Sequence, residues 1–160
     1  MESVRGKLKE KAVLMSNCKI CLKEQSSDPY FVMEIGHYVI YHAPVEKQLV
    51  GYLYVEPKRH VESWHELSSD EKSELPEIIA QLEKMLYQEI QAERVYTLTV
   101  GEVVRHLHIH LIPRCAGDAI DGLELIQRAA GPMGTGQPVS KADIQQFIER
   151  VQVLNGKSVQ

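Results

Sequence analysis

Hydrophobic and polar positions in the first part of the chain alternate in short runs that predict β-strands. Three runs rich in β-branched and aromatic residues cover residues 30–35, 37–42 and 51–55. Turn-prone positions such as Gly36 and Pro44 separate them. Short runs divided by turns are typical of strands that pair with their neighbours in sequence, so we expect an antiparallel meander.

From Ser68 onward the apolar positions recur at the spacing of a helix. Ser68 and Glu71 have the spacing of a capping box, in which the two residues satisfy each other's backbone N–H groups at a helix start. The apolar positions that follow are Leu75, Ile78, Ile79, Leu82, Met85, Leu86 and Ile90. Pro76 removes a hydrogen-bond donor and crowds the preceding turn, so we expect this long helix to be kinked or split there.

Two more strands and a last helix complete the pattern. The strands are expected over residues 95–100 and 105–112, and the helix from Ser140 or Lys141 to about Leu154. The glycine- and proline-rich residues 131–138 indicate a loop that lacks the Gly-Lys-Ser/Thr ending of a phosphate-binding P-loop. This order predicts an α+β fold, with an antiparallel sheet of about five strands, one long helix and a C-terminal helix.

Composition narrows the class of protein. With 160 residues and 44% hydrophobic residues, the chain has the size and core of one domain, residues 1–160. A net charge of −4 disfavours polymeric nucleic acid as a partner. No apolar run approaches the ~20 residues that cross a bilayer, and the first residues are charged, so we expect a cytoplasmic protein without membrane contact. Three cysteines make a disulfide framework unexpected.

The candidate chemistry is concentrated in residues 106–110, where every second position is a histidine. In an extended chain His106, His108 and His110 share one face, ~6.6 Å apart, while Leu107 and Ile109 enter the core. A neutral imidazole keeps a lone pair at pH 7, so it can attack phosphorus and form a phosphoramidate that water resolves. Flanking imidazoles can stabilise the charge on the phosphate oxygens.

Other readings of the three histidines remain open. Alternate imidazoles on a strand can chelate one catalytic metal ion that keeps an open position for water. They can also be the polar outer face of a strand without chemistry. A separate metal site is indicated by Cys18 and Cys21, whose two-residue gap lets both thiolates reach one zinc ion, although two buried thiols would fit the same spacing. Cys115 has no partner at ligand spacing.

The run from His106 to Arg114 resembles the signature of the histidine triad (HIT) superfamily, His-x-His-x-His followed by apolar residues and often Pro-Arg. The motif Pro57-Lys58-Arg59-His60 and Gly101 extend the resemblance. It covers about residues 18–114 and leaves residues 115–160 as a C-terminal extension. The resemblance implies a HIT-like fold, a small nucleotide substrate, no organic cofactor and a homodimer.

The resemblance also implies roles for single residues. His108 would be the nucleophile that forms a nucleotidyl-histidine intermediate, and His110 would contact the phosphate, with His106 lining the same site. The reaction would be hydrolysis or transfer of a nucleoside phosphate, from a phosphoramidate for example. Zinc-bearing branches of the superfamily look the same at His60 and His106, which would complete a structural Cys₂His₂ zinc site. A nucleotide-binding module without catalysis stays open as an alternative.

Several positions depart from the superfamily pattern. Tyr52 stands where many relatives have a histidine, and Glu102 and Val103 stand where glutamine and serine or threonine commonly precede the triad. Residues 39–44 lack the aspartate that often holds ribose hydroxyls, and His42 is the candidate to take its place. Arg114 is a candidate for a bidentate phosphate contact.

Overall fold

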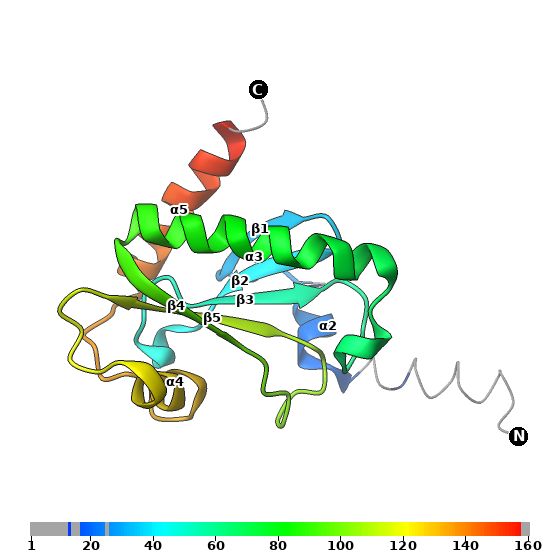
Figure 1. Cartoon of the computed structure of the whole chain (residues 1–160), viewed down its shortest axis with the longest axis horizontal. Coiled ribbons are helices and arrows are strands. Elements are labelled where there is room, and N and C mark those ends of the chain that lie inside the picture. Colours follow the sequence, from blue (N-terminus) through cyan, green and yellow to red (C-terminus); the bar gives the residue numbers. More distant parts are fainter. Residues whose placement is uncertain (1–12, 14–16, 25, 158–160) are drawn as a thin grey trace, which may run out of the picture.

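The computed structural model, which describes residues 13, 17–24 and 26–157, is built on one five-stranded antiparallel sheet (Figure 1). The strand order is β1-β2-β3-β5-β4. The bounds are β1 Phe31–Ile35, β2 Tyr38–His42, β3 Leu53–Pro57, β4 Ala92–Leu98 and β5 Ile109–Cys115. The expected α+β class, the meander and the five strands are confirmed.

Four α-helices and two short 3₁₀ helices accompany the sheet in the described part of the chain. They are α2 Lys19–Lys23, η1 Val45–Lys47, η2 Trp64–Glu66, α3 Ser69–Glu89, α4 Gly122–Ala130 and α5 Lys141–Lys157. The expected capping box begins α3, because the Ser68 hydroxyl accepts from the Glu71 N–H at 3.2 Å and the Glu71 carboxylate accepts from the Ser68 N–H at 2.7 Å. Pro76 does not split α3, whose buried residues Leu75 and Ile78 flank it.

Two expectations about element bounds are corrected, and one helix was not expected. The strand that carries the triad begins at Ile109 and not at Arg105, so His106 and His108 lie in irregular chain just before β5. Strand β4 begins at Ala92, three residues earlier than expected. The helix α4 was not expected from the sequence.

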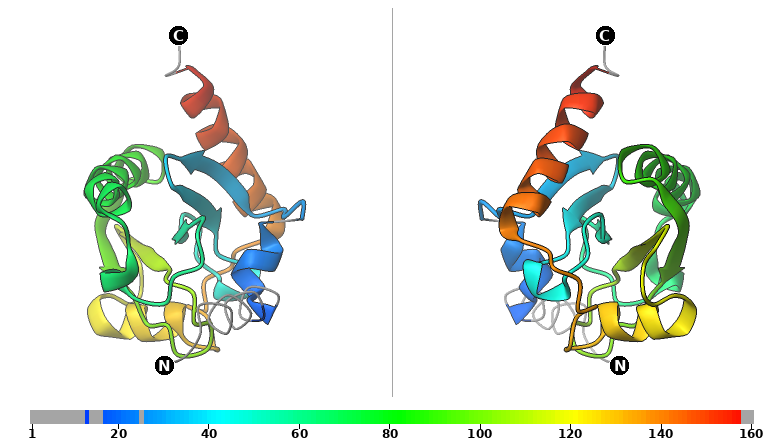
Figure 2. Two further views of the ribbon diagram at one scale, coloured as in Figure 1. Left: turned by 90° about the vertical axis from the view of Figure 1, so that its right-hand side faces the viewer. Right: turned by 90° about the vertical axis from the view of Figure 1, so that its left-hand side faces the viewer.

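The two faces of the sheet have different covers. One face carries the main core, where sheet residues such as Leu53, Ile109 and Leu111 meet α3 and α5. On the opposite face Ile112 packs against Leu125 of α4 in a smaller cluster. Figures 1 and 2 show α3 and α4 on opposite sides of the strands. Because α4 covers only part of its face, side chains on that face can form an accessible site.

Register identifies the residues on the face that α4 partly covers. Tyr54 lies opposite Tyr41 on one side and opposite His110 on the other. Glu56 shares this face, because it follows Tyr54 by two positions on β3.

No described helix has the length and apolarity to span a membrane.

Candidate active site and metal centre

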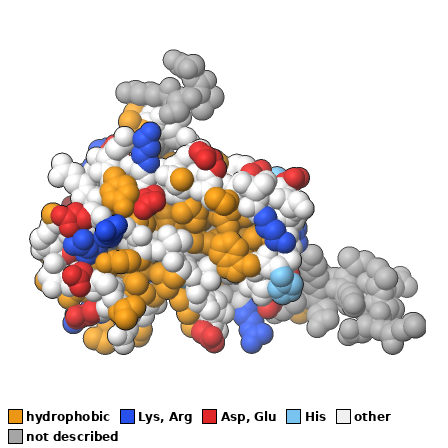
Figure 3. All heavy atoms as spheres, in the orientation of Figure 1, with side chains coloured by type: hydrophobic (Ala, Val, Ile, Leu, Met, Phe, Trp, Pro, Cys, Tyr) orange, Lys and Arg blue, Asp and Glu red, His pale blue; other side chains and the backbone are white. Residues whose placement is uncertain are grey.

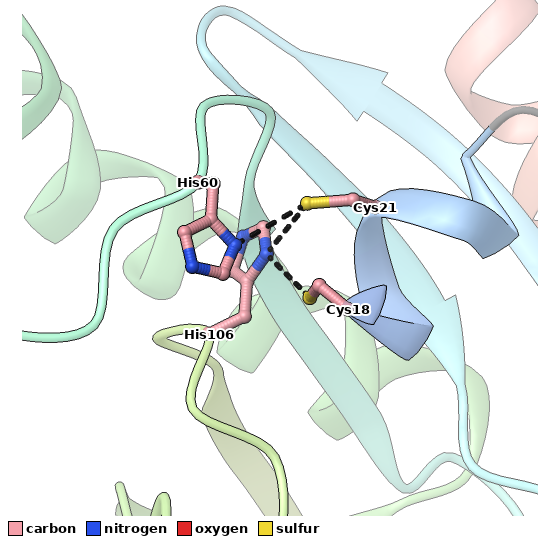
Figure 4. Close-up of side chains that lie close together, drawn as sticks. All are labelled: Cys18, Cys21, His60 and His106. Atoms are coloured by element: carbon pink, nitrogen blue, oxygen red, sulfur yellow. Dashed lines mark hydrogen bonds between the residues drawn. The ribbon is translucent and has the colours of Figure 1, made fainter. Parts of the chain in front are cut away.

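Four buried side chains from three separate segments form a candidate metal centre (Figure 4). Cys18 caps the start of α2 and Cys21 lies within it, while His60 follows β3 and His106 precedes β5. Their ligand atoms all lie within 4.8 Å of one another. The structure therefore brings together the four residues that the sequence singled out for zinc.

The distances in this cluster fit a tetrahedral zinc ion. The Nδ1 atom of His106 lies 3.5 Å from the Cys18 sulfur and 3.4 Å from the Cys21 sulfur, and Nδ1 of His60 lies 3.4 Å from the Cys21 sulfur. Bonds of ~2.3 Å to sulfur and ~2.0 Å to nitrogen, at a tetrahedral angle, hold these atoms about 3.5 Å apart. The distances between the ligand atoms are therefore those that a tetrahedral zinc ion requires.

Protonation of the cluster also suits a cation. The Nε2–H of His106 donates to the Pro57 carbonyl at 2.8 Å, which leaves Nδ1 with a lone pair directed at the thiols. Without a cation, burial and the neighbouring Cys18 raise the pKa of the Cys21 thiol to about 12. Two thiolates in this place therefore need a positive charge between them, which a divalent metal would supply.

His108 is the half-exposed member of the triad, and its ring orientation is fixed. Its Nδ1 lies 2.7 Å from the carbonyl oxygen of His106. A carbonyl only accepts, so Nδ1 carries the proton and Nε2 keeps its lone pair. Nucleophilic attack by an imidazole requires such a lone pair on an accessible nitrogen.

His110 lies beside His108, with 4.8 Å between the ring centroids. The His110 side chain is 5% exposed, and burial, with a smaller effect of His108, lowers its pKa to about 4, so the ring is neutral at pH 7. Its Nδ1 lies 2.6 Å from the Tyr52 hydroxyl, and its buried Nε2 has no hydrogen-bond partner among the described residues. A neutral ring with an unsatisfied nitrogen next to His108 is suited to contact a substrate oxygen.

A buried carboxylate faces the same region. Glu56 is 2% exposed, accepts from Lys23 of α2 at 2.8 Å, and has an Oε2 atom without a partner in the described chain. Burial raises the pKa of Glu56, whereas Lys23 and the charge of His108 lower it. The ammonium of Lys23 also lies 3.6 Å from the centre of the Tyr41 ring. Through Lys23, the helix that carries the cysteines reaches the face that carries His108.

A cavity of about 440 Å³ opens on the same face, over β1 and β2. Val39 and Tyr41 line it, and they pair in register with Glu56 and Tyr54 of β3. The remaining lining residues are mostly polar: Glu24, Ser26, Ser27, Asp28, Phe31, Glu34 and Lys58. Burial, followed by the charge of Glu56, raises the pKa of the Glu24 carboxyl to about 7. The cavity therefore offers hydrogen-bond acceptors two strands away from the triad.

The structure does not bring all the candidate residues to this face. His106 is fully buried with both ring nitrogens engaged in the metal cluster and at Pro57, so the expected substrate contact of His106 is wrong. His42 faces the main core, where its ring contacts Phe147 and its Nε2 accepts from the Gly51 N–H at 2.8 Å. It cannot hold a ribose on the opposite face, and that expectation is also wrong.

Arg114 also lies away from His110. Arg114 is four residues along β5 from His110, ~13 Å at strand rise, and pairs with Glu93 at 2.9 Å. Its expected phosphate contact is not supported. Glu102 and Val103 are exposed between β4 and β5.

Sequence reasoning missed Glu56 and the contact of Tyr52 with His110. Both share a strand face with Tyr54, and alternation along β3 was the signal that could have found them. No sequence pattern indicates that Lys23 reaches Glu56, because that contact depends on how α2 packs against the sheet.

Comparison with known proteins identifies a family and several solved structures with a similar fold. The family model of the HIT domain matches residues 31–117. A search of curated protein sequences found no match. The solved structures that resemble the chain include a Zn-bound histidine triad family protein from Mycobacterium smegmatis, with 11% identity and a TM-score of 0.66 over 90% of this chain and 99% of that chain.

Two other solved structures have the same fold. A hypothetical histidine triad nucleotide-binding protein from Sulfolobus tokodaii has 20% identity and a TM-score of 0.59, over 89% of this chain and 92% of that chain. The diadenosine triphosphate hydrolase of Plasmodium falciparum has 11% identity and a TM-score of 0.58, over 82% and 80% of the two chains.

Proposed function

The chain belongs to the HIT domain family, and on this basis we propose that it hydrolyses or transfers a nucleoside phosphate through a covalent intermediate on His108. One observation carries the proposal: the hydrogen bond from Nδ1–H of His108 to the His106 carbonyl keeps the Nε2 lone pair available beside His110. The names of the nucleotide-binding and diadenosine triphosphate hydrolase neighbours agree with this reaction class.

In the first step of this mechanism, the Nε2 lone pair of His108 forms a bond to phosphorus. The bond from phosphorus to the leaving group breaks, and the leaving group keeps the electron pair and takes up a proton from solvent. His110 donates from Nε2–H to a non-bridging phosphate oxygen, which gains negative charge in the transition state. The product is a nucleotidyl-histidine whose imidazole ring carries a positive charge.

In the second step, water or another acceptor attacks the same phosphorus. A new oxygen–phosphorus bond forms, the attacking oxygen releases its proton to solvent, the nitrogen–phosphorus bond breaks, and the electron pair returns to Nε2 of His108. Glu56, buried on the same face and held by Lys23, places negative charge near the ring while it is cationic. A hydrolase would use water here, and a transferase would use a second substrate.

The cavity over β1 and β2 is the place that we assign to the nucleoside. It shares a sheet face with His110, and its carboxylates and hydroxyls can accept from or donate to a sugar and a base. Three acidic side chains line it, Glu24, Asp28 and Glu34, against one basic side chain, Lys58, and this excess of acidic groups disfavours a second phosphate there. The proposed substrate therefore has one nucleoside in the cavity and its phosphorus at His108.

We further propose that the Cys₂His₂ cluster holds a structural zinc ion. All four positions come from the protein, so no position is left open for water, and zinc would supply a rigid link between α2 and the segments that follow β3 and precede β5. Among the described residues, His106 is the triad member that joins this ligand group. Because His106 belongs to the cysteine cluster and His108 and His110 do not, the covalent mechanism without zinc is favoured over a catalytic metal held by the three histidines.

A homodimer, which the family resemblance implies, is part of the proposal. Strand β4 is at one edge of the sheet, and Val95, Tyr96 and Leu98 on it are partly exposed. Hydrophobic side chains gather on the side of the molecule where α3 and the edge of the sheet lie (Figure 3). An edge strand beside apolar surface is suited to pair with a second copy of the chain.

The test is turnover of a fluorogenic adenosine phosphoramidate by the wild-type protein and by His108→Ala. Loss of the nucleophile should lower kcat by about 10⁴-fold or more. The variant should keep the melting temperature of the wild type within a few degrees, because the His108 side chain is outside all three clusters of buried residues.

Zinc content, measured on the same proteins, separates the two metal hypotheses. We expect about one zinc ion per chain in the wild type and in His108→Ala, and none in Cys18→Ser. Zinc that is lost on removal of His108 would favour a catalytic metal site instead, and an active His108→Ala protein would exclude the covalent mechanism.

A further inference from the structure

Tyr52 is a buried residue of the site whose position the proposed reaction does not by itself explain. It precedes β3, is fully buried, and its hydroxyl lies 2.6 Å from Nδ1 of His110. Nε2 of the same ring is buried and unpaired among the described residues. One nitrogen of His110 is thus engaged by Tyr52, and the other is directed to no described protein group.

The contact between Tyr52 and His110 allows two arrangements of the proton. The hydroxyl can donate to Nδ1, which places the ring proton on Nε2, or Nδ1–H can donate to the hydroxyl oxygen, which leaves a lone pair on Nε2. Burial strongly raises the pKa of Tyr52, so its hydroxyl keeps its proton at any physiological pH. Two buried acceptors lie near that proton, the Tyr54 hydroxyl and Nδ1 of the neutral His110 ring, and the contact of 2.6 Å with Nδ1 favours His110.

We propose that Tyr52 is a positioning residue that donates to Nδ1 of His110 and holds this ring as the Nε2–H tautomer. The role within catalysis rests on the proposed function, in which Nε2–H of His110 donates to a phosphate oxygen. With the opposite tautomer, two lone pairs would face each other, one on His110 and one on the phosphate, and no hydrogen bond could form. The hydroxyl therefore decides whether His110 attracts or repels the substrate.

The C-terminal extension protects this contact. Tyr52 packs in one apolar cluster with Ile112 of β5 and with Leu125 and Ala129 of α4. Helix α4 lies outside residues 31–117, which the HIT domain model matches. Because α4 excludes water, the hydrogen bond between Tyr52 and His110 is stronger, and no water molecule competes for either partner. The extension thus contributes to the site through the surroundings of Tyr52.

A hydroxyl differs chemically from the histidine that many relatives carry at this position. A neutral histidine can present either a donor or an acceptor, and it can gain a proton near pH 6.5. A buried tyrosine has a single proton that it retains. The Tyr52 hydroxyl therefore offers His110 the same donor over the whole range of working pH.

The first experiment determines the tautomer of His110 by two-bond ¹H–¹⁵N NMR of uniformly labelled protein, with the His110 signals assigned by their loss in His110→Asn. The wild type should show the Nε2–H tautomer. In Tyr52→Phe, which keeps the ring and removes the hydroxyl, the His110 signals should change to a mixture of tautomers. The same variant should lose about 10-fold to 100-fold in kcat on the adenosine phosphoramidate.

Tyr38→Phe is the matched control. Tyr38 is also a fully buried tyrosine, and its hydroxyl donates to the Glu71 carbonyl at 2.8 Å on the main-core face. It should lose a similar hydrogen bond without any change in the His110 signals or in kcat.

An Nδ1–H tautomer of His110 in the wild-type protein would overturn the proposal even if Tyr52→Phe failed to fold. Unchanged His110 signals and unchanged kcat in a folded Tyr52→Phe protein would overturn it as well. The NMR measurement needs no substrate. If it showed the expected tautomers while the wild type failed to turn over the phosphoramidate, the proposed reaction would fail and the tautomer assignment would stand.

Discussion

At the scale of single residues, the three histidines of the motif differ in the hydrogen-bond partners of their ring nitrogens. His106 donates to a carbonyl through Nε2 and faces the cysteines with Nδ1, whereas His108 donates to a carbonyl through Nδ1 and keeps Nε2. His110 has a hydroxyl at Nδ1. The alternation in sequence predicted a common face, but the choice of nitrogen depends on partners that are distant in the sequence.

His42 gives a prediction about stability and pH. Burial lowers its pKa to about 4 in the folded protein, against ~6.5 in the unfolded chain. The unfolded state therefore binds a proton that the folded state resists, so stability is fully present above pH ~6.5 and falls as the pH drops toward 4. Between pH 7.5 and pH 5 this group should cost about 2 kcal/mol of the free energy of unfolding.

His42→Gln isolates that contribution, because an amide can replace both ring contacts and does not titrate in this range. Urea denaturation at the two pH values should show a smaller loss for the variant than for the wild type. Loss of metal at low pH is common to both proteins and cancels in the comparison. Equal losses would show that His42 does not titrate with a lowered pKa.

At the scale of elements, the capping box of α3 anchors the chain next to His60, a residue of the proposed metal centre. The Glu71 carboxylate accepts from Arg59 at 2.7 Å as well as from the Ser68 N–H, and Arg59 directly precedes His60. Hydrogen bonds from Arg59, and then from Ser68, lower the pKa of Glu71 to about 2. The start of α3 thereby helps to fix a loop of the metal centre.

Ser68→Ala should destabilise the protein by about 1 kcal/mol, because the Glu71 N–H loses its acceptor at the helix start. Thermal or urea unfolding measures this change. Ser73→Ala is the control, since Ser73 is an exposed residue inside the same helix and alanine is the better helix former. A Ser68→Ala protein as stable as the control variant would contradict the role of the cap.

The elements also show how far sequence reasoning reaches. The meander, α3 and α5 were predictable because their apolar positions keep a clear period over many residues. The start of β5 was not, since His106 turns toward the cysteines and bends the chain before pairing begins. Helix α4 has nine residues and exposes Leu123, so its apolar stripe is short. Its Glu124–Arg128 pair at i,i+4 was the usable signal.

At the scale of the whole molecule, the proposed metal centre joins segments that are far apart in the sequence. Cys18 and His106 are 88 residues apart, and α2 has few residues of its own with which to hold its place. Because a bound metal stabilises the folded state alone, its free energy of binding adds to stability. The same link positions Lys23 against Glu56 beside the triad.

Chelation should therefore lower the melting temperature of the wild type by about 10 °C, as expected for a loss of roughly 4 kcal/mol in a chain of this size. Cys18→Ser should melt at the lower temperature with or without chelator. Cys115→Ser should respond to the chelator as the wild type does, because Cys115 lies outside the cluster. A wild-type protein whose melting is insensitive to chelation would contradict a structural zinc ion.

The central claim is that the His108 ring forms a bond to phosphorus, and trapping that bond is its most direct test. The wild-type protein would be mixed with an adenosine phosphoramidate, quenched within milliseconds without acid, and measured by intact-mass spectrometry and peptide mapping. We expect an added adenosine monophosphate group on the peptide that contains His108, absent in His108→Ala. Turnover of the substrate with no adduct on His108, or with the adduct on another residue, would contradict the account.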